Sequence, residues 1–192
     1  MKKNLYFKPK INKKRLKINF YLDIGPDLLA RCIPPCPSGC RCYDPGSNIC
    51  VDGNTCFLPG TEILMADNSS CRIEDIKPGD KVISYDLETG ELRPSIVNKL
   101  IVHQEDPSGF YLINNYLKVT GHHRIWVKNK GWTTVFNLKI DDEVFTSKKK
   151  YVRIKTKEKV EGTYTVYNLS LKDKLHNFFA GGILVHNIKI CN

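Results

Sequence analysis

DIKPGDKVIS, residues 75–84, and NLKIDDEVFT, residues 137–146, share one frame: an apolar residue, Lys, two residues, Asp, one residue, Val, an apolar residue and a hydroxyl. The positions of this frame are matched at one constant offset along the chain. Segments that repeat at a fixed offset indicate that a structural unit has been duplicated. The pair therefore predicts a domain with internal pseudo-twofold symmetry.

Around these copies, the chain from residue 56 onward alternates short runs of Val, Ile, Thr and aromatic residues with Gly, Pro, Asn or Asp. Such runs, bounded by turn residues, are typical of β-strands. No stretch of useful length follows the period of a helix instead. We therefore expect an all-β domain over residues 56–187. Its predicted strands are 61–65, 81–85, 96–102, 110–113, 116–120, 124–128, 133–136, 143–146, 151–155, 163–171 and 177–185.

The positive charge is concentrated at the beginning of the chain. Eight of the 30 Lys and Arg side chains lie within residues 1–22, where there is no Asp or Glu, so the rest of the chain is nearly neutral. Residues 1–31 are predicted to form a basic, solvated and disordered arm. Binding of this arm to nucleic acid or another polyanion, driven by counterion release, is the less favoured interpretation.

Length and hydropathy set further limits. A chain of 192 residues with 41% hydrophobic residues is long enough for one good core and an appendage. The basic arm lacks the apolar run of a signal peptide, and no stretch approaches the length of a transmembrane helix. We therefore expect no membrane span and, by default, a cytoplasmic location.

Cysteine usage marks a second unit. Six of the eight Cys residues lie within residues 32–56, CIPPCPSGCRCYDPGSNICVDGNTC, among Pro and Gly. This density predicts a small Cys-rich module over residues 32–55. A disulfide-bonded module, a metal-bound module and a module with neither all stay open, although the spacing does not match a paired CxxC zinc site. Oxidation of Cys56 into this cluster would block any reaction of its thiol.

Three short blocks carry reactive side chains: CFLPGTEI, VTGHHRIWV and LHNFFAGGILVHN. Their reactive members are, in chain order, Cys56, Thr120, His123, His176, His186 and Asn187. With this order of blocks, the chain resembles an intein, a member of the Hint superfamily shared by inteins, bacterial intein-like domains and Hedgehog autoprocessing domains. The resemblance covers residues 56–187 and implies a horseshoe-shaped β fold that cleaves its own flanking peptide bonds. Residues 188–192 would then form the C-terminal flank.

The resemblance assigns the first reaction to Cys56, whose thiol would attack the carbonyl of Thr55 and exchange an amide for a thioester. A thiol with an ordinary pKa of about 8.5 is mostly protonated at neutral pH and needs a proton acceptor. The second block implies that His123 has this role and that Thr120 donates a hydrogen bond nearby. His122 is the weaker candidate, because it points to the opposite face of an extended segment.

The resemblance assigns the second reaction to Asn187, whose side-chain amide would close a succinimide and expel the nitrogen of Ile188. His186 would hydrogen-bond the carbonyl oxygen as negative charge develops there. His176 would move the proton from the amide to the departing nitrogen. This single-turnover chemistry requires no cofactor and no metal ion.

Two residues depart from the pattern of splicing inteins. Ile188 stands where those proteins carry the Cys, Ser or Thr that accepts the acyl group. We therefore expect uncoupled cleavages, with the thioester lost to water or to an external thiol or amine, rather than splicing. Asn168, in VYNLSL, stands where many inteins carry an Asp that assists the first step. This departure weakens the prediction for Cys56 more than the prediction for Asn187.

The interval between the second block and VYNLSL is too short for a second enzymatic domain, so the resemblance is to a mini-intein. Residues 146–162, which are rich in Lys, are predicted to form an exposed hairpin. An alternative hypothesis places the function in the N-terminal segment. Residues 1–55 would then be a basic, Cys-rich binding or toxin-like module, carried by an inactive Hint scaffold.

Overall fold

The computed structural model describes residues 55–187 and two short strands, β1 (Tyr43–Asp44) and β2 (Ile49–Cys50). The predictions for residues 1–31, for most of the Cys-rich module and for residues 188–192 lie outside the described residues. Regular structure in the described part consists of strands and short 3₁₀ helices, so the predicted all-β class is confirmed. No helix in this part is both long and apolar enough to traverse a lipid bilayer.

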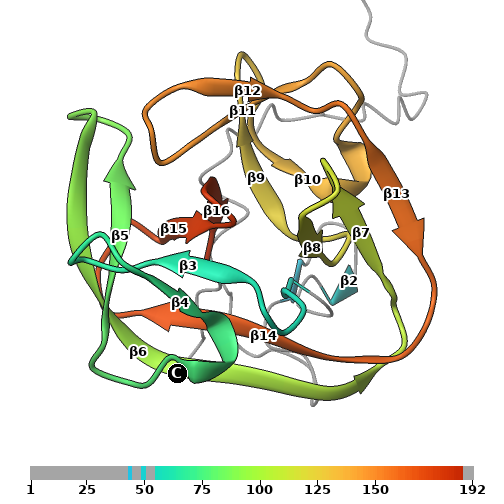
Figure 1. Cartoon of the computed structure of the whole chain (residues 1–192), viewed down its shortest axis with the longest axis horizontal. Helices are drawn as coiled ribbons and strands as arrows, with labels where there is room; N and C mark the ends of the chain where they lie inside the picture. The colour runs from blue at the N-terminus through green and yellow to red at the C-terminus, as the bar shows by residue number, and fades with distance from the viewer. Residues whose placement is uncertain (1–42, 45–48, 51–54, 188–192) are drawn as a thin grey trace, which may run out of the picture.

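Fourteen strands make up the described domain (Figure 1). They are β3 (Glu62–Leu64), β4 (Ser70–Arg72), β5 (Lys81–Asp86), β6 (Glu91–Asp106), β7 (Phe110–Ile113), β8 (Leu117–Val119), β9 (Arg124–Val127), β10 (Gly131–Thr134), β11 (Glu143–Phe145), β12 (Tyr151–Arg153), β13 (Lys157–Val160), β14 (Tyr164–Leu171), β15 (Asn177–Ala180) and β16 (Ile183–His186). Two 3₁₀ helices, η2 (Ile73–Asp75) and η3 (Val135–Asn137), lie between them.

The strands form three sheets around one core. The largest follows the order β12-β11-β9-β16-β15-β3-β4, with β10 paired to β9, and the smaller two follow β13-β7-β8 and β14-β6-β5. In Figure 1 the long strands β6 and β14 curve along one side of the molecule, and the hairpin of β15 and β16 lies near its centre. This arrangement is the horseshoe-shaped Hint fold that the sequence predicted.

The predicted duplication is visible in the hydrogen bonds. Asp80 Oδ2 accepts a bond from the Lys77 backbone N–H at 2.8 Å, and Asp142 Oδ2 accepts the equivalent bond from Lys139 at 2.9 Å. The helices η2 and η3, which precede these turns, are related by the same offset as the two sequence copies. Each Asp therefore holds the same turn in front of a strand, β5 in one copy and β11 in the other.

The hairpin β15–β16 joins the two copies. Ala180 pairs with Ile63 of β3, and Val185 pairs with Ile125 of β9, so the hairpin contacts equivalent positions of the two copies. The prediction of one strand over residues 177–185 is wrong. Gly181 and Gly182 form a turn with φ of 54° and 73°, and consecutive positive φ angles are typical of a tight β-hairpin turn.

The segment 146–162 also differs from its prediction. Its strand β12 pairs with β11, whereas β13 pairs with β7 in a different sheet, so the segment crosses between sheets instead of folding into its own hairpin. Strand β4 is absent from the predicted set, because its sequence SCR has no apolar alternation; it is held by pairing with β3.

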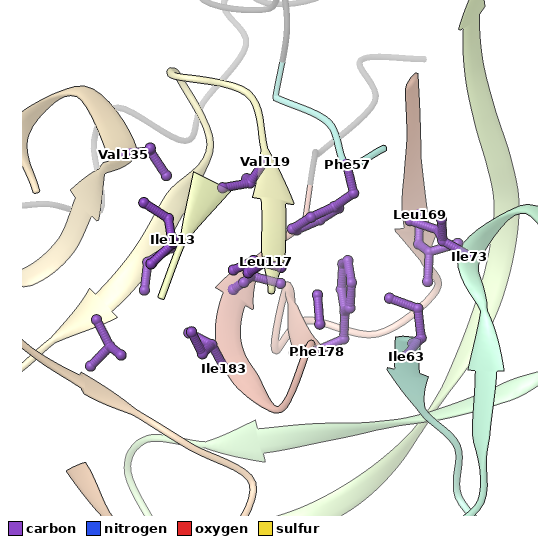
Figure 2. Close-up of a cluster of buried hydrophobic side chains, with 14 of the residues drawn as sticks. Phe57, Ile63, Ile73, Ile113, Leu117, Val119, Val135, Leu169, Phe178 and Ile183 are labelled. Carbon is purple, nitrogen blue, oxygen red and sulfur yellow. The ribbon is translucent and has the colours of Figure 1, made fainter. Parts of the chain in front are cut away.

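The core centres on Phe57, which follows the first cysteine of the domain. Figure 2 shows Phe57 and Phe178 pointing toward each other, and their ring centroids lie 6.0 Å apart. Residues from both copies, including Ile63 and Val135, surround them and are fully buried. Burial of large apolar side chains dominates the free energy of folding. Burial of the Phe57 side chain in this core therefore holds the first residues of the domain in the interior.

Candidate active site

The segment of residues 55–58 is held between β8 and β14. Phe57 forms isolated bridges with Val119 of β8 and Tyr167 of β14. Phe57 and Tyr167 exchange two backbone hydrogen bonds of 2.8 Å, and the Thr120 N–H donates to the Cys56 carbonyl at 2.9 Å. The antiparallel register therefore places Cys56 between Thr120 and the residue after Tyr167, which is Asn168.

Two side chains hold the peptide group between Thr55 and Cys56: Thr120, directly after β8, and Asn168 of β14. The Cys56 N–H donates to Thr120 Oγ1 at 2.7 Å, and the amide nitrogen of Asn168 donates a short hydrogen bond to the Thr55 carbonyl oxygen. Cys56, Thr120 and Asn168 are fully buried. Both polar atoms of this peptide group are thus bonded to side chains.

His123 lies beside this peptide group and is also fully buried. Its ring packs on Phe57 with 4.2 Å between ring centroids. Neither ring nitrogen meets strict hydrogen-bond geometry within the described residues, although the backbones of Thr55 and His186 are close enough to act on the ring. Burial disfavours the imidazolium form and lowers the pKa of His123 to about 3, although polar backbone groups of Thr55 and His186 act in the opposite direction. A neutral imidazole in this position can accept a proton.

Asn187, at the end of β16, is held by backbone groups. Its N–H donates to the His176 carbonyl at 2.9 Å. In the side-chain orientation that satisfies both partners, the amide nitrogen donates to the same carbonyl at 2.8 Å and the amide oxygen accepts from the Leu171 N–H at 3.1 Å. His176 has a φ of 51°, in the left-handed region. The His176 carbonyl that accepts from the Asn187 side chain is therefore positioned by a left-handed backbone conformation.

His186 is mostly buried and contacts aromatic rings on either side. Its ring centroid lies 5.0 Å from that of Trp132 and 6.4 Å from that of His176. Burial lowers the pKa of His186 to about 4, and the Arg124 cation acts in the same direction. The backbone of Asn187 has the opposite effect, which indicates that the imidazole lies against it.

A known protein family shares this combination of sequence and fold. The model of the family described as "Pretoxin HINT domain" matches residues 63–188. The chain belongs to the pretoxin HINT domain family. The match begins after Cys56 and includes Asn187, so the family model itself does not cover the first candidate nucleophile.

Solved structures agree with this assignment. The bacterial intein-like domain from Clostridium thermocellum is 28% identical, with a TM-score of 0.63, and the match covers 69% of this chain and 99% of that one. A DnaB intein from Synechocystis is 18% identical, with a TM-score of 0.60 and coverage of 70% and 99%. The TvoVMA intein is 22% identical, with a TM-score of 0.60 and coverage of 71% and 99%. None of the curated proteins compared with the chain matches it.

In this pretoxin HINT domain the candidate residues form two groups. Cys56, Thr120 and His123 lie around the Thr55–Cys56 peptide group, and His176, His186 and Asn187 lie at the end of β16. The two groups are neighbours, since both the backbone of His186, which raises the pKa of His123, and the charge of the His186 ring, which lowers it, act on that residue. His122 packs against Phe136 with 4.7 Å between ring centroids and is exposed, outside both groups.

Sequence reasoning assigned no role to two residues of this site. Asn168 stood out only as a departure from a pattern, and Arg124, whose charge lowers the pKa of His186, did not stand out at all. The alternation around VYNLSL could have placed Asn168 on a buried face, but the partner of its side chain depends on strand pairing. Over residues 55–187, no three His, Cys, Asp or Glu side chains are grouped so that they could hold a metal ion.

Proposed function

We propose that this pretoxin HINT domain cleaves its own chain at two peptide bonds, Thr55–Cys56 and Asn187–Ile188. The observation that carries the first cleavage is the double contact on one peptide group: Asn168 binds its oxygen and Thr120 binds its N–H. A peptide group inside a β-sheet ordinarily bonds to backbone groups of adjacent strands. Here side chains adjacent to a buried thiol take that place, which supports a reaction at this carbonyl.

In the first step, the Cys56 sulfur bonds to the Thr55 carbonyl carbon and the carbon–nitrogen bond breaks. His123 takes the thiol proton and returns a proton to the departing Cys56 nitrogen. Asn168 donates to the oxygen as it gains negative charge, the role of an oxyanion-hole donor. An Asn in this position needs no proton transfer to act as a donor, so it can replace the carboxyl group expected from the intein pattern.

In the second step, the Asn187 side-chain nitrogen attacks its own backbone carbonyl and the bond to Ile188 breaks. The contact of the amide nitrogen with the His176 carbonyl, at 2.8 Å, limits its rotation. His186, whose ring lies against the Asn187 backbone, donates to the carbonyl oxygen. The His176 ring, 6.4 Å from the His186 ring, transfers the proton to the leaving nitrogen.

The two cleavages are uncoupled in this proposal, because Ile188 has no nucleophilic atom to accept the acyl group. The thioester at Cys56 is instead resolved by water or by an external nucleophile, and residues 1–55 leave as a basic, Cys-rich product. The family is one of pretoxins, which supports a toxin-like role for the released segment. The domain would act once, as the processing device of its own chain.

Intact-mass spectrometry of the freshly expressed 22.0 kDa chain tests this function. Cys56→Ala should retain residues 1–55 but still lose residues 188–192, and Asn187→Ala should do the reverse. Hydroxylamine, which cleaves thioesters, should accelerate release of residues 1–55 from the chain that keeps Cys56. An uncleaved chain in every variant and with hydroxylamine would support the alternative, an inactive Hint scaffold that carries a binding module.

A further inference from the structure

A pocket lies on the face of the sheet that carries Cys56. It has a volume of about 260 Å³, and its lining comes from the segment after Cys56 and from β7, β8 and the beginning of β14. The lining residues are Leu58, Pro59, Phe110, Lys118, Tyr164 and Thr165. An apolar cavity of about 150 Å³ is enough for benzene, so this one has room for a single substituted ring.

Strand alternation places the pocket next to the reacting thiol. Phe57 packs in the main core, whereas Cys56 and Leu58 belong to a second buried cluster on the opposite face, together with Phe110 and Val166. Leu58 and Phe110 also line the pocket. Residues two apart in a strand lie about 6.6 Å from each other on one face. The pocket therefore begins one such step from Cys56.

The rim of the pocket carries a positive charge. Lys118 lies opposite Leu58, whose N–H donates to the Lys118 carbonyl at 3.2 Å, and the Lys118 side chain is exposed. Within the described residues, Lys118 takes part in no salt bridge. Its ammonium group repels a protonated amine and attracts an anionic group.

We propose that this pocket binds the external nucleophile that resolves the Cys56 thioester, and that this nucleophile is a small thiol with an apolar body and an anionic group. This inference rests on the autoprocessing function proposed above. The apolar body occupies the space between Leu58, Phe110 and Tyr164, and the anion lies near Lys118. A sulfur atom at the end of the body opposite the anion then reaches toward the Thr55 carbonyl.

The step is a thioester exchange. The external thiolate bonds to the Thr55 carbonyl carbon, the bond to the Cys56 sulfur breaks, and the Cys56 thiolate takes a proton. Residues 1–55 leave as a thioester of the external thiol, which water later hydrolyses. Asn168 can donate to the same carbonyl oxygen during this exchange, because its amide already contacts that atom.

A pair of matched thiols tests the pocket. The full chain carrying Asn187→Ala, kept reduced with a phosphine, is treated with increasing concentrations of 4-mercaptophenylacetate or its neutral amide, and release of residues 1–55 is followed by intact mass. We expect the rate with the carboxylate to saturate and to exceed the rate with the amide by about threefold, the size of one partly exposed charge contact. Lys118→Met should remove this preference, whereas Lys99→Met, an exposed Lys of β6, should keep it.

A second variant tests the apolar part of the pocket. Thr165→Tyr, at a half-buried position of the lining, should abolish saturation by both aromatic thiols and leave cleavage by 2-mercaptoethanesulfonate, which has no ring, unchanged. Equal, linear rates for all thiols in all variants, with hydroxylamine still releasing residues 1–55, would overturn the pocket but not the thioester. No release with any reagent, including hydroxylamine, would overturn both.

Discussion

The two candidate cleavage sites differ in what holds the reacting group. At Thr55–Cys56, two uncharged side chains, Thr120 directly after β8 and Asn168 of β14, hold the peptide group. At Asn187, backbone groups hold the side chain, and the surrounding side chains include two imidazole rings, of which His186 is influenced by the Arg124 cation. The peptide group of the first site is therefore held by fixed dipoles, with the His123 ring beside it, whereas the second site contains two imidazole rings and should respond more strongly to charge and pH. The two reactions can be separated by substitution and by solution conditions.

The largest expected effect concerns Asn168. Asn168→Ala removes the amide that donates to the Thr55 carbonyl oxygen, so the first cleavage should slow by about 10²–10³-fold, as expected for loss of one oxyanion donor. The second cleavage should keep its rate, since Asn168 makes no contact with Asn187 among the hydrogen bonds of the described residues. Time courses of both products by intact mass give the two rates from one sample.

The matched control is Asn168→Asp, which keeps the shape and the oxygen that accepts from the Leu169 N–H. An ionised Asp has no donor, so the first cleavage should be slow at neutral pH and should recover as acid protonates the carboxyl group. If Asn168→Ala slowed both cleavages equally, the difference between the two sites would be lost and Asn168 would have a structural role.

The next effect concerns acid stability. His123 and His186 have lowered pKa values, about 3 and about 4, because burial disfavours their charged forms, whereas an unfolded His titrates at about 6.5. Below pH 6.5 the unfolded chain thus binds more protons than the folded one, so stability is fully present above pH 6.5 and falls with decreasing pH. Each His should contribute a loss of about 1.4 kcal/mol per pH unit.

Urea unfolding of a chain with both Cys56→Ala and Asn187→Ala, between pH 7.5 and 5, measures this slope. This window lies above the ordinary range of Asp side chains such as Asp142, whose pKa is lowered further by Lys130. His186→Gln should remove about half of the slope and leave the contribution of the more deeply buried His123. A free energy of unfolding that does not change over this window would contradict the burial of both rings.

How much of the fold and of the candidate site could be predicted from sequence depends on how far apart along the chain the contacting residues are. The repeated frame at Lys77–Asp80 and Lys139–Asp142 is local, so it predicted a duplication that the hydrogen bonds confirm. The contact between Asn168 and the Thr55 carbonyl spans 113 residues and depends on how β14 pairs with Phe57. That Asn168 is an Asn gives no information about which residue of the N-terminal segment β14 pairs with.

The same reasoning explains the errors in the strand assignments. An apolar run containing Gly181 and Gly182 is typical both of one buried strand and of a hairpin, and only the pairing of Ala180 with Ile183 distinguishes them. Strand β13 is rich in Lys and Glu, and its pairing with β7, rather than its own pattern, makes it a strand. Tertiary context decides such short segments.

A smaller effect should come from Arg124. Its charge lowers the pKa of His186, so Arg124→Met should raise that pKa. An imidazolium donates a stronger hydrogen bond to a developing oxyanion than a neutral imidazole. The second cleavage should thus accelerate as pH falls, and in Arg124→Met this acceleration should begin at a higher pH, with a gain of about threefold near pH 6.

The pH–rate profiles of both cleavages, at low ionic strength, measure this shift. Lys128→Met provides the matched control, because it removes a cation next to β9 that pairs with Glu143 and is not among the groups that shift the pKa of His186. Arg124 also lowers the pKa of His123, but as the smallest of the causes that act on that ring, so the profile of the first cleavage should shift less. A shift of equal size in both profiles would contradict the stronger dependence of the second site on charge.

The smallest expected effect lies in the turn that carries the second site. Gly182→Ala places a side chain at a φ of 73° with no atom nearer than 3.7 Å to its Cβ, so the cost is conformational, about 1 kcal/mol. Gly181→Ala adds a contact of 3.2 Å with Leu117 and should cost more. Because β16 leads from this turn to Asn187, whereas residues 55–58 are held by β8 and β14, both variants should slow the second cleavage more than the first. Urea unfolding measures the differences in the free energy of unfolding, and mass spectrometry measures the ratio of the two cleavage rates. An unchanged ratio would mean that pairing with β9 and β15 holds β16 in place without a contribution from the turn.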